Sequence, residues 1–326
     1  MDSPRLQRRV VIAAGLLAGL GAGPGPAFAR QSYPSRMVRI FSPVAAGSGS
    51  DLFARFFAAK LSDALGQSFV VENRPGGDGV IAANAARAEA PDGYTLLVGS
   101  NSPMAVNVAT FRNLPYDPRQ DFRPVSGMTR TMAILVVPGD SPFRTVADVV
   151  RAGREGQPVL CATYTAGYQL AAAQFASKAG FAFENVMYRG LGQIMTDVIG
   201  GRLELACIDT AGPIDTVKAG KVRALAVTGE ARHPDLPDVP TLKESGFDAV
   251  HYSWTALFAD ARVPDHCVER IAGVMQAAFA QPEVRAFIAN NGGEMLPLAP
   301  DALHRFQINE IERFQKAARD SGFEPK

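Results

Sequence analysis

Residues 38–65 constrain the fold more than any other stretch, because they have the pattern of a buried strand, a loop of small residues and an amphipathic helix. Residues 38–41 are apolar and partly β-branched, and residues 45–50 carry no bulky side chain, so the backbone can turn sharply there. Apolar residues then recur at three- and four-residue spacing up to Leu65, and Gly66 is placed to end the helix. We expect Ser50 or Asp51 to cap its first turn.

The loop before this helix is a candidate anion site. The first turn of a helix has backbone N–H groups without intrahelical partners, and the positive end of the helix dipole points into the loop. This arrangement suits a carboxylate or a phosphate. A connection that binds nothing is the alternative, and Asp51 can equally be a first-turn charge favoured by the dipole. The candidate ligand contacts are Ala46, Gly47, Ser48, Gly49, Ser50 and Asp51.

The same plan returns in the second half of the chain. Residues 157–162 predict a strand, residues 163–167 a polar loop, and residues 168–178 an Ala-rich helix followed by Gly180. Strands and helices alternate along the chain, which predicts an α/β fold with parallel or mixed sheets and helices on both faces. A chain of 326 residues is too long for one ordinary core, so we expect two lobes. Each lobe would offer one helix N-terminus to a small anion between them.

Ligands of such sheets bind beyond the C-terminal ends of the strands. Ser100 and Ser102 follow one predicted strand and Asp209 follows another, so we expect them at the cleft, although Asp209 can equally cap a helix. Arg189 also follows a predicted strand, where it can pair with a carboxylate or lie on the surface. Trp254, the only tryptophan, is expected in the core or at a hinge.

The N-terminus has the pattern of a secretory signal peptide. Basic residues precede an apolar run over residues 10–20, and Ala27-Phe28-Ala29 forms an A-x-A cleavage site. We expect residues 1–29 to be removed near Ala29 and the rest of the chain to be exported, with a structural first helix as the alternative. No later segment is long and apolar enough to cross a bilayer.

Charge and cysteine content exclude several classes of protein. The formal net charge is +1 and no basic stripe is present, so a nucleic-acid partner is not expected. An odd cysteine count does not suit a disulfide scaffold. Cys161 and Cys207 lie in apolar runs and should be buried, and a bridge between them stays open if their strands adjoin. We expect no metal and no cofactor.

Several motifs, taken together and in order, resemble the tripartite tricarboxylate transporter substrate-binding proteins, also called the Bug family of extracytoplasmic solute receptors. The resemblance runs from about Tyr33 to Lys326. It rests on residues 33–36, 43–51, 73–77, 91–97, 114–117 with 121–122, 200–201, 221–228 and 236–241.

The resemblance implies a periplasmic-binding-protein type II (Venus flytrap) fold that closes on a small carboxylate. It implies residues 30–130 plus 251–326 as lobe 1 and residues 131–250 as lobe 2. It further implies a periplasmic protein that passes a small carboxylate, such as a di- or tricarboxylate, to the membrane subunits of a tripartite tricarboxylate-type transporter. We expect this protein to be a monomer. In the family the two loops, one per lobe, hold ligand carboxylates. In lobe 2 the matching residues are Thr163, Tyr164, Thr165, Ala166, Gly167 and Tyr168.

The chain departs from the family pattern at both loops. The first loop has Ala46 where the family has Pro, and Ser48 where it has Gly. The second loop, Gly- and Ser-rich in the family and followed by His-Leu, contains Tyr164 and Tyr168 and is bulkier. We hypothesise that the two tyrosines form a rim that suits an aromatic or larger acid.

Two other functions remain open at this point. A sensor that reports its bound state to a membrane signalling protein would use the same fold. An exported hydrolase has little support, because the chain has no Gly-x-Ser-x-Gly elbow and no His-Glu-x-x-His motif. We therefore predict a receptor rather than an enzyme. Its closure would be a hinge motion about strands that cross between lobes near residues 126–134 and 250–257.

Overall fold

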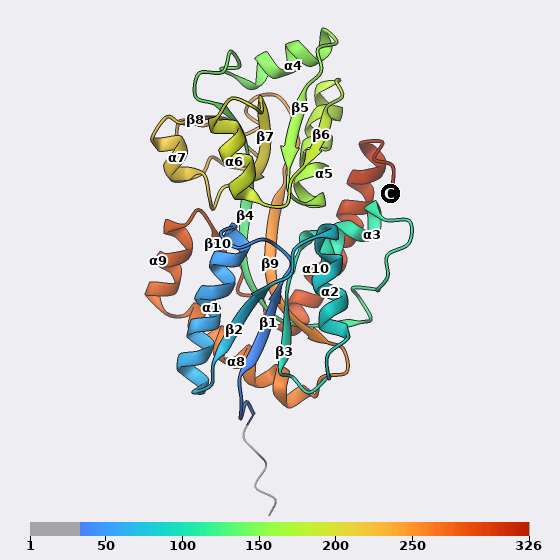
Figure 1. Ribbon diagram of the computed structural model, residues 1–326, viewed down its shortest axis with the longest axis vertical. Coiled ribbons are helices and arrows are strands. Elements are labelled where there is room, and N and C mark those ends of the chain that lie inside the picture. The colour runs from blue at the N-terminus through green and yellow to red at the C-terminus, as the bar shows by residue number, and fades with distance from the viewer. Residues whose placement is uncertain (1–32, 326) are drawn as a thin grey trace, which may run out of the picture. The chain divides into compact units, whose positions relative to one another are not determined.

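The computed structural model describes residues 33–325, and the predicted signal peptide lies outside them. From Tyr33 onward the chain forms one compact unit. This part of the chain contains two sheets that lie end to end and share the long strand β4 (Phe122–Pro138). Helices surround each sheet (Figure 1). No helix within residues 33–325 has the length and apolar character needed to span a membrane.

The first sheet contains β2 (Phe69–Asn73), β1 (Val38–Ser42), β3 (Thr95–Ser100), β9 (Tyr252–Asp260) and the first part of β4, in this order. Strand β1 is parallel to β2 and β3, whereas β9 is antiparallel to β3 and β4. The short β10 (Glu294–Met295) pairs with β4. We call the part of the molecule around this sheet lobe 1.

The second sheet repeats this order, and the part around it is lobe 2. Strands β6 (Glu184–Met187), β5 (Leu160–Thr163) and β7 (Leu205–Asp209) are parallel, and the second part of β4 is antiparallel to β7 and to β8 (Val222–Val227). Strands β1, β2 and β3 therefore correspond in topology to β5, β6 and β7. The mixed sheets predicted from the sequence are confirmed.

Strand β4 changes sheets between Met132, which pairs with β9, and Ala133, which pairs with β7. The chain returns to lobe 1 beside this point, where the N–H of His251 donates to the carbonyl of Thr228 at 2.9 Å. Both crossings fall within the stretches expected from the sequence. A hinge motion about them, and a division into two independent bodies, stay predictions.

The helices cover both faces of the sheets (Figure 1). Lobe 1 contains α1 (Gly49–Leu65), α2 (Val80–Arg87), α3 (Asn107–Thr110), α8 (Asp265–Phe279), α9 (Pro282–Asn290) and α10 (Pro300–Asp320), with short turns η1 (Gly77–Gly79) and η2 (Ser102–Val106). Lobe 2 contains α4 (Val146–Arg154), α5 (Ala166–Ala179), α6 (Leu191–Ile199) and α7 (Ile214–Lys218). Helix α10 contacts β4, α3 and α5, so it packs against both lobes.

The helix expected after the strand and small-residue loop of residues 38–50 is α1, and its apolar side is buried in the core of lobe 1. Phe53, Phe57 and Leu61 recur every fourth residue and are each at most 1% exposed. Gly66 ends the helix with φ of 67°, the left-handed conformation that glycine adopts without steric cost. The predicted cap was wrong. The N-cap is Ser48, whose hydroxyl accepts from the N–H of Asp51, because the helix begins at Gly49.

Other expectations were met in part. Trp254 is buried in the core, where its Nε1 donates to Glu310 at 3.0 Å. All three cysteines are free and buried. The proline-rich stretch around residue 120 is partly buried, because Tyr116 is buried and donates to the Pro103 carbonyl, and Phe122 begins β4.

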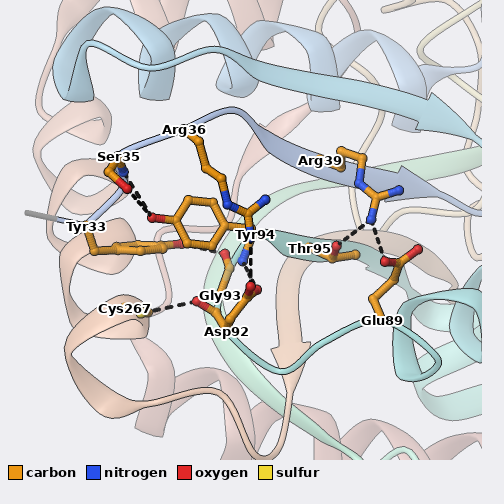
Figure 2. A network of polar contacts seen from close by, with 10 residues as sticks. All are labelled: Tyr33, Ser35, Arg36, Arg39, Glu89, Asp92, Gly93, Tyr94, Thr95 and Cys267. Carbon is orange, nitrogen blue, oxygen red and sulfur yellow. Dashed lines mark hydrogen bonds and ion pairs between the residues drawn. The ribbon is translucent and has the colours of Figure 1, made fainter. Parts of the chain in front are cut away.

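The first described residues are fixed at the start of β1 and β3. The Tyr33 hydroxyl donates to the Gly93 carbonyl at 2.6 Å, and Arg36 pairs with Asp92 while lying over the ring of Tyr94 (Figure 2). Because Gly93 and Tyr94 precede β3, this network ties down the N-terminal ends of the parallel strands. The C-terminal ends point the other way, toward lobe 2.

Candidate functional site

A cleft of about 550 Å³ lies where the C-terminal strand ends of the two lobes meet. Loops after β1, β2 and β3 line it from lobe 1, and loops after β5 and β6 line it from lobe 2. Its lining residues are Pro43, Val44, Pro75, Gly76, Gly77, Asp78, Gly79, Ile81, Ser100, Ser102, Pro103, Tyr164, Thr165, Met187, Tyr188 and Arg189. This is the edge at which parallel sheets bind ligands.

The residues predicted from the sequence are divided among three places. Ser100, Ser102, Tyr164 and Thr165 line the cleft. A void of about 10 Å³, roughly the room for one water, is lined in part by Gly49, Ser50, Tyr168 and Asp209. The remaining predicted residues line neither space; they are Ala46, Gly47, Ser48, Asp51, Thr163, Ala166 and Gly167.

Asp51 is at the centre of a hydrogen-bond network inside lobe 1. Its Oδ2 accepts from the N–H of Gly47 at 3.1 Å and from Arg55 at 3.0 Å, and its Oδ1 accepts from Asn73 at 2.7 Å. Partial burial opposes ionisation, but the Arg55 and Asn73 hydrogen bonds hold the pKa of Asp51 below its usual value. These contacts favour the structural interpretation of Asp51, because its carboxylate already stabilises the loop before α1.

The second loop is held by the other lobe rather than by its own side chains. Thr165, the N-cap of α5, forms no side-chain cap hydrogen bond. The N–H of Ala166 instead donates to Asp78 Oδ1 at 2.8 Å, and the N–H of Gly167 donates to Ser102 Oγ at 3.1 Å. Thr163 is fully buried and donates to Asn185. The expectation that the α5 amides are open to a ligand is therefore not met in this conformation.

The two tyrosines do not form the expected open rim. Tyr164 and Tyr168 are 8% and 4% exposed and pack against each other with ring centroids 5.1 Å apart. The Tyr164 hydroxyl donates to Asp209 Oδ2. Burial raises the pKa of Asp209, and this hydrogen bond from Tyr164 opposes the rise. Tyr164 still contributes to the cleft wall, but Tyr168 belongs to the buried interface between the lobes.

Three glycines let the lobes approach closely. A Cβ added to Gly49 would lie 2.8 Å from Asp209 Oδ1, and one added to Gly167 would lie 2.4 Å from Asn101 Nδ2. A Cβ on Gly190 would lie 2.9 Å from the Cβ of Ala45. Each contact joins one lobe to the other, so the structure describes the lobes closed upon each other.

Sequence reasoning missed the loop after β2, which brings Gly76, Gly77, Asp78 and Gly79 into the cleft. The signal was available, because this loop follows a parallel strand and therefore lies at the same sheet edge as the loops that were chosen. Arg189, for which a ligand contact and a surface role were both open, lines the cleft and is exposed. Asp78 and Arg189 give the cleft one charge of each sign.

Metal ligands are not gathered anywhere in the part of the chain that the structure describes: no group of three or more His, Cys, Asp or Glu side chains could hold an ion. The cleft thus offers amides, hydroxyls, one Asp, one Arg and apolar side chains.

A family model described as "Tripartite tricarboxylate transporter family receptor" matches residues 53–322. The chain belongs to this receptor family. The match spans both lobes and includes every cleft-lining element except β1 and the loop after it. The resemblance noted in the sequence is thereby confirmed.

Curated relatives agree with this assignment. A UPF0065 protein in the TAR-I ttuE-ttuC' intergenic region of Agrobacterium vitis is 37% identical over 311 residues, covering 92% of this chain and 88% of the relative. The protein BugT of Bordetella pertussis is 30% identical over 318 residues, covering 94% and 97%.

Solved structures agree as well. R. palustris Rpa4515 with adipate is 30% identical with a TM-score of 0.86, covering 90% of this chain and 100% of that one. MatC from Rhodopseudomonas palustris with bound malate is 27% identical with a TM-score of 0.83, covering 87% and 99%. The chain is accordingly a solute-binding receptor with a periplasmic-binding-protein fold, and the prediction that it is not an enzyme is confirmed.

Proposed function

We propose that this receptor captures a small organic carboxylate in the cleft and delivers it to the membrane subunits of a tripartite tricarboxylate-type transporter. The cleft volume of about 550 Å³ is within the range of small-molecule sites. The similarity to structures that hold adipate and malate supports a carboxylate as the ligand. The predicted signal peptide supports export and cleavage near Ala29.

Arg189 is the observation that carries this proposal. Its side chain lines the cleft, is exposed, and forms no ion pair or hydrogen bond with another residue in the range 33–325. A guanidinium presents donors in a planar fork that matches both oxygens of a carboxylate. The loop that carries it is fixed where Gly190 abuts Ala45 of lobe 1, so the charge is placed at the junction of the lobes.

The rest of the cleft favours an acid with an apolar body. Val44, Ile81 and Met187 line it, and Ile81 and Met187 are 53% and 44% exposed, which leaves apolar area for a ligand to cover. Asp78 lies in the same cleft and would repel a second carboxylate placed near it. We therefore infer a preference for aromatic or longer aliphatic acids over compact, multiply charged ones. From the predicted set we retain Ser100, Ser102, Tyr164 and Thr165 as ligand contacts.

Isothermal titration calorimetry with adipate, malate, benzoate and phenylacetate, and with the uncharged amides of the last two, tests the proposal. We expect at least one acid to bind and its amide to bind at least tenfold more weakly. Arg189→Gln should weaken binding of that acid about tenfold, because a charge-assisted hydrogen bond contributes about 1.5 kcal/mol.

The matched control is Arg151→Gln on α4, since this arginine is also exposed in lobe 2 but pairs with Asp148 outside the cleft. If the amides bind as tightly as the corresponding acids, the proposal that the receptor recognises a carboxylate is contradicted. Equal affinities of the two arginine variants would contradict the role of Arg189.

A further inference from the structure

The loop after β2 caps a helix of the opposite lobe. Asp78 of lobe 1 accepts at 2.8 Å from the N–H of Ala166, the first residue of α5, and Ser102 accepts at 3.1 Å from that of Gly167. These are the first amides of a 14-residue helix, which have no intrahelical acceptor. A carboxylate at this position is also favoured by the helix dipole. Asp78 therefore takes the place at which a ligand carboxylate was expected.

The backbone is arranged so that this side chain crosses between the lobes. Asp78 has φ of 54° and ψ of 34°, and it is the only non-glycine residue in the range 33–325 with positive φ. Gly77 and Gly79 on either side also have positive φ, which glycine adopts without strain. Asn107 donates to the Asp78 carbonyl at 3.0 Å, and Gly79 packs tightly against Pro103 and Pro43. The turn is thus fixed to lobe 1 while its carboxylate contacts lobe 2.

A carboxylate of lobe 2 lies near the other helix, but among the described residues it forms no hydrogen bond with the amides of that helix. Asp209 of lobe 2 lies against Gly49, the first residue of the 17-residue α1, with Oδ1 2.8 Å from the position of an added Cβ. Tyr164 donates to its Oδ2, and backbone N–H groups of its own loop, at Ala211 and Gly212, also oppose the rise in pKa that burial causes. The Asp209 carboxylate is therefore held by lobe 2 and lies beside the first turn of α1.

Asp78 follows β2 and Ser102 comes just after β3, so both acceptors lie at the edge of the lobe 1 sheet that faces lobe 2. Closure of the lobes therefore brings both of them to the N-terminus of α5.

We propose that Asp78, together with Ser102, latches lobe 1 to the N-terminus of α5 in lobe 2, so that this receptor closes in the absence of ligand. Combined with the function proposed above, the latch assigns the ligand carboxylate to Arg189 rather than to the α5 amides. Asp78 is a positioning residue in this scheme, because it acts through the relative placement of the lobes.

The test measures lobe separation in ligand-free protein. Spin labels on cysteines introduced at exposed positions of each lobe, Asp63→Cys on α1 and Arg144→Cys before α4, give the interlobe distance by double electron–electron resonance. The native cysteines are buried and should label poorly. We expect one short distance for the otherwise unchanged protein. Asp78→Gly, which suits the positive φ, should raise the ratio of open to closed molecules about tenfold.

Two further variants separate charge from hydrogen bonding. Asp78→Asn keeps an acceptor without the charge and should give an intermediate open fraction, whereas Asp140→Asn, at an exposed position of lobe 2 away from the interface, should change nothing. A long distance in the unchanged protein, or the same short distance after Asp78→Gly, would overturn the latch. Because no ligand is present, neither result bears on carboxylate binding.

A substitution in α5 that adds bulk at the interface tests the same contact between the lobes from lobe 2. Gly167→Ala should favour α5 by helix propensity, but its Cβ would lie 2.4 Å from Asn101 Nδ2 of lobe 1. We expect a longer interlobe distance with no loss of helix signal in circular dichroism. Gly192→Ala on α6 is the control, because nothing lies within 4 Å of its added Cβ. An unchanged distance in Gly167→Ala would contradict the close approach on which the latch depends.

Discussion

The two strand–loop–helix units of this receptor have the same topology but are capped in opposite ways. The unit of lobe 1 caps itself: Ser48 caps α1, and Asp51 binds the loop through Gly47, Arg55 and Asn73. The unit of lobe 2 has no side-chain cap of its own, and the first amides of α5 bind Asp78 and Ser102 of lobe 1.

Because of this difference, the first unit should affect the stability of its lobe, and the second should affect closure of the two lobes. A loop that satisfies its own amides contributes to the folding of its lobe whatever the other lobe does. A helix whose amides are satisfied only by the opposite lobe must bind water or a ligand whenever the lobes part. Variants of the first unit should therefore change the free energy of unfolding, whereas variants of the second should mainly change the opening of the cleft.

The largest effect is expected at Asp51. Asp51→Ala should lower the free energy of unfolding by about 3 kcal/mol, because it removes charge-assisted hydrogen bonds and leaves the Gly47 and Asn73 donors without their acceptor. Urea denaturation followed by circular dichroism measures this. Asp63→Ala, at an exposed position of the same helix, should cost less than about 0.5 kcal/mol. Equal losses of unfolding free energy in the two variants would show that the hydrogen bonds of Asp51 do not stabilise the lobe.

A smaller effect on stability, dependent on pH, should arise where α5 packs against the point at which the chain returns to lobe 1. His251 packs against Tyr168 of α5 and Phe314, and burial, with the nearby Arg313, lowers its pKa to about 3. The unfolded chain then binds more protons than the native one below the ordinary histidine pKa. Stability should fall by about 2 kcal/mol between pH 7 and pH 5 through this group alone.

Between pH 7 and pH 5 the contribution of the first strand–loop–helix unit to the free energy of unfolding should not change. The pKa of Asp51 is lowered, so its contribution is lost only below the ordinary aspartate range, and Asp209, whose pKa is raised, acts in the opposite direction to His251. His251→Phe should therefore flatten the loss of stability between pH 7 and pH 5, and His304→Gln at an exposed position of α10 should not. Denaturant midpoints measured at several pH values check this. Parallel slopes for all three proteins would refute the assignment to His251.

The smallest effect compares the two N-caps directly. Ser48→Ala should lower the free energy of unfolding by about 1 kcal/mol, since the hydroxyl accepts from the Asp51 N–H. Thr165→Ala should cost less than about 0.5 kcal/mol, because Thr165 forms no cap hydrogen bond. Thermal or urea denaturation of the pair is sufficient. A larger loss at Thr165 than at Ser48 would reverse the comparison on which the other predictions depend.

The elements and their alternation follow from the residue pattern alone, because hydrophobic periodicity and glycine stops are local signals. They placed α1 with its end at Gly66, the buried run that ends at Ile208, and the crossings between the lobes. They also placed Ser100, Ser102, Tyr164 and Thr165 at the edge where the cleft lies. The motifs in order were enough to indicate the receptor family.

Which groups meet across the interface depends on how the two lobes pack, and no local pattern indicates it. The sequence predicted a helix N-terminus near residue 168, but not that the helix begins at Ala166 or that Asp78, 88 positions earlier, supplies the acceptor for its first amide. It showed two tyrosines in the second loop, but not that closure buries them against Asp209 and His251. The reason is that a helix end has the same local pattern whether water, a ligand or a distant carboxylate satisfies its amides. That choice is made only when the two lobes pack together.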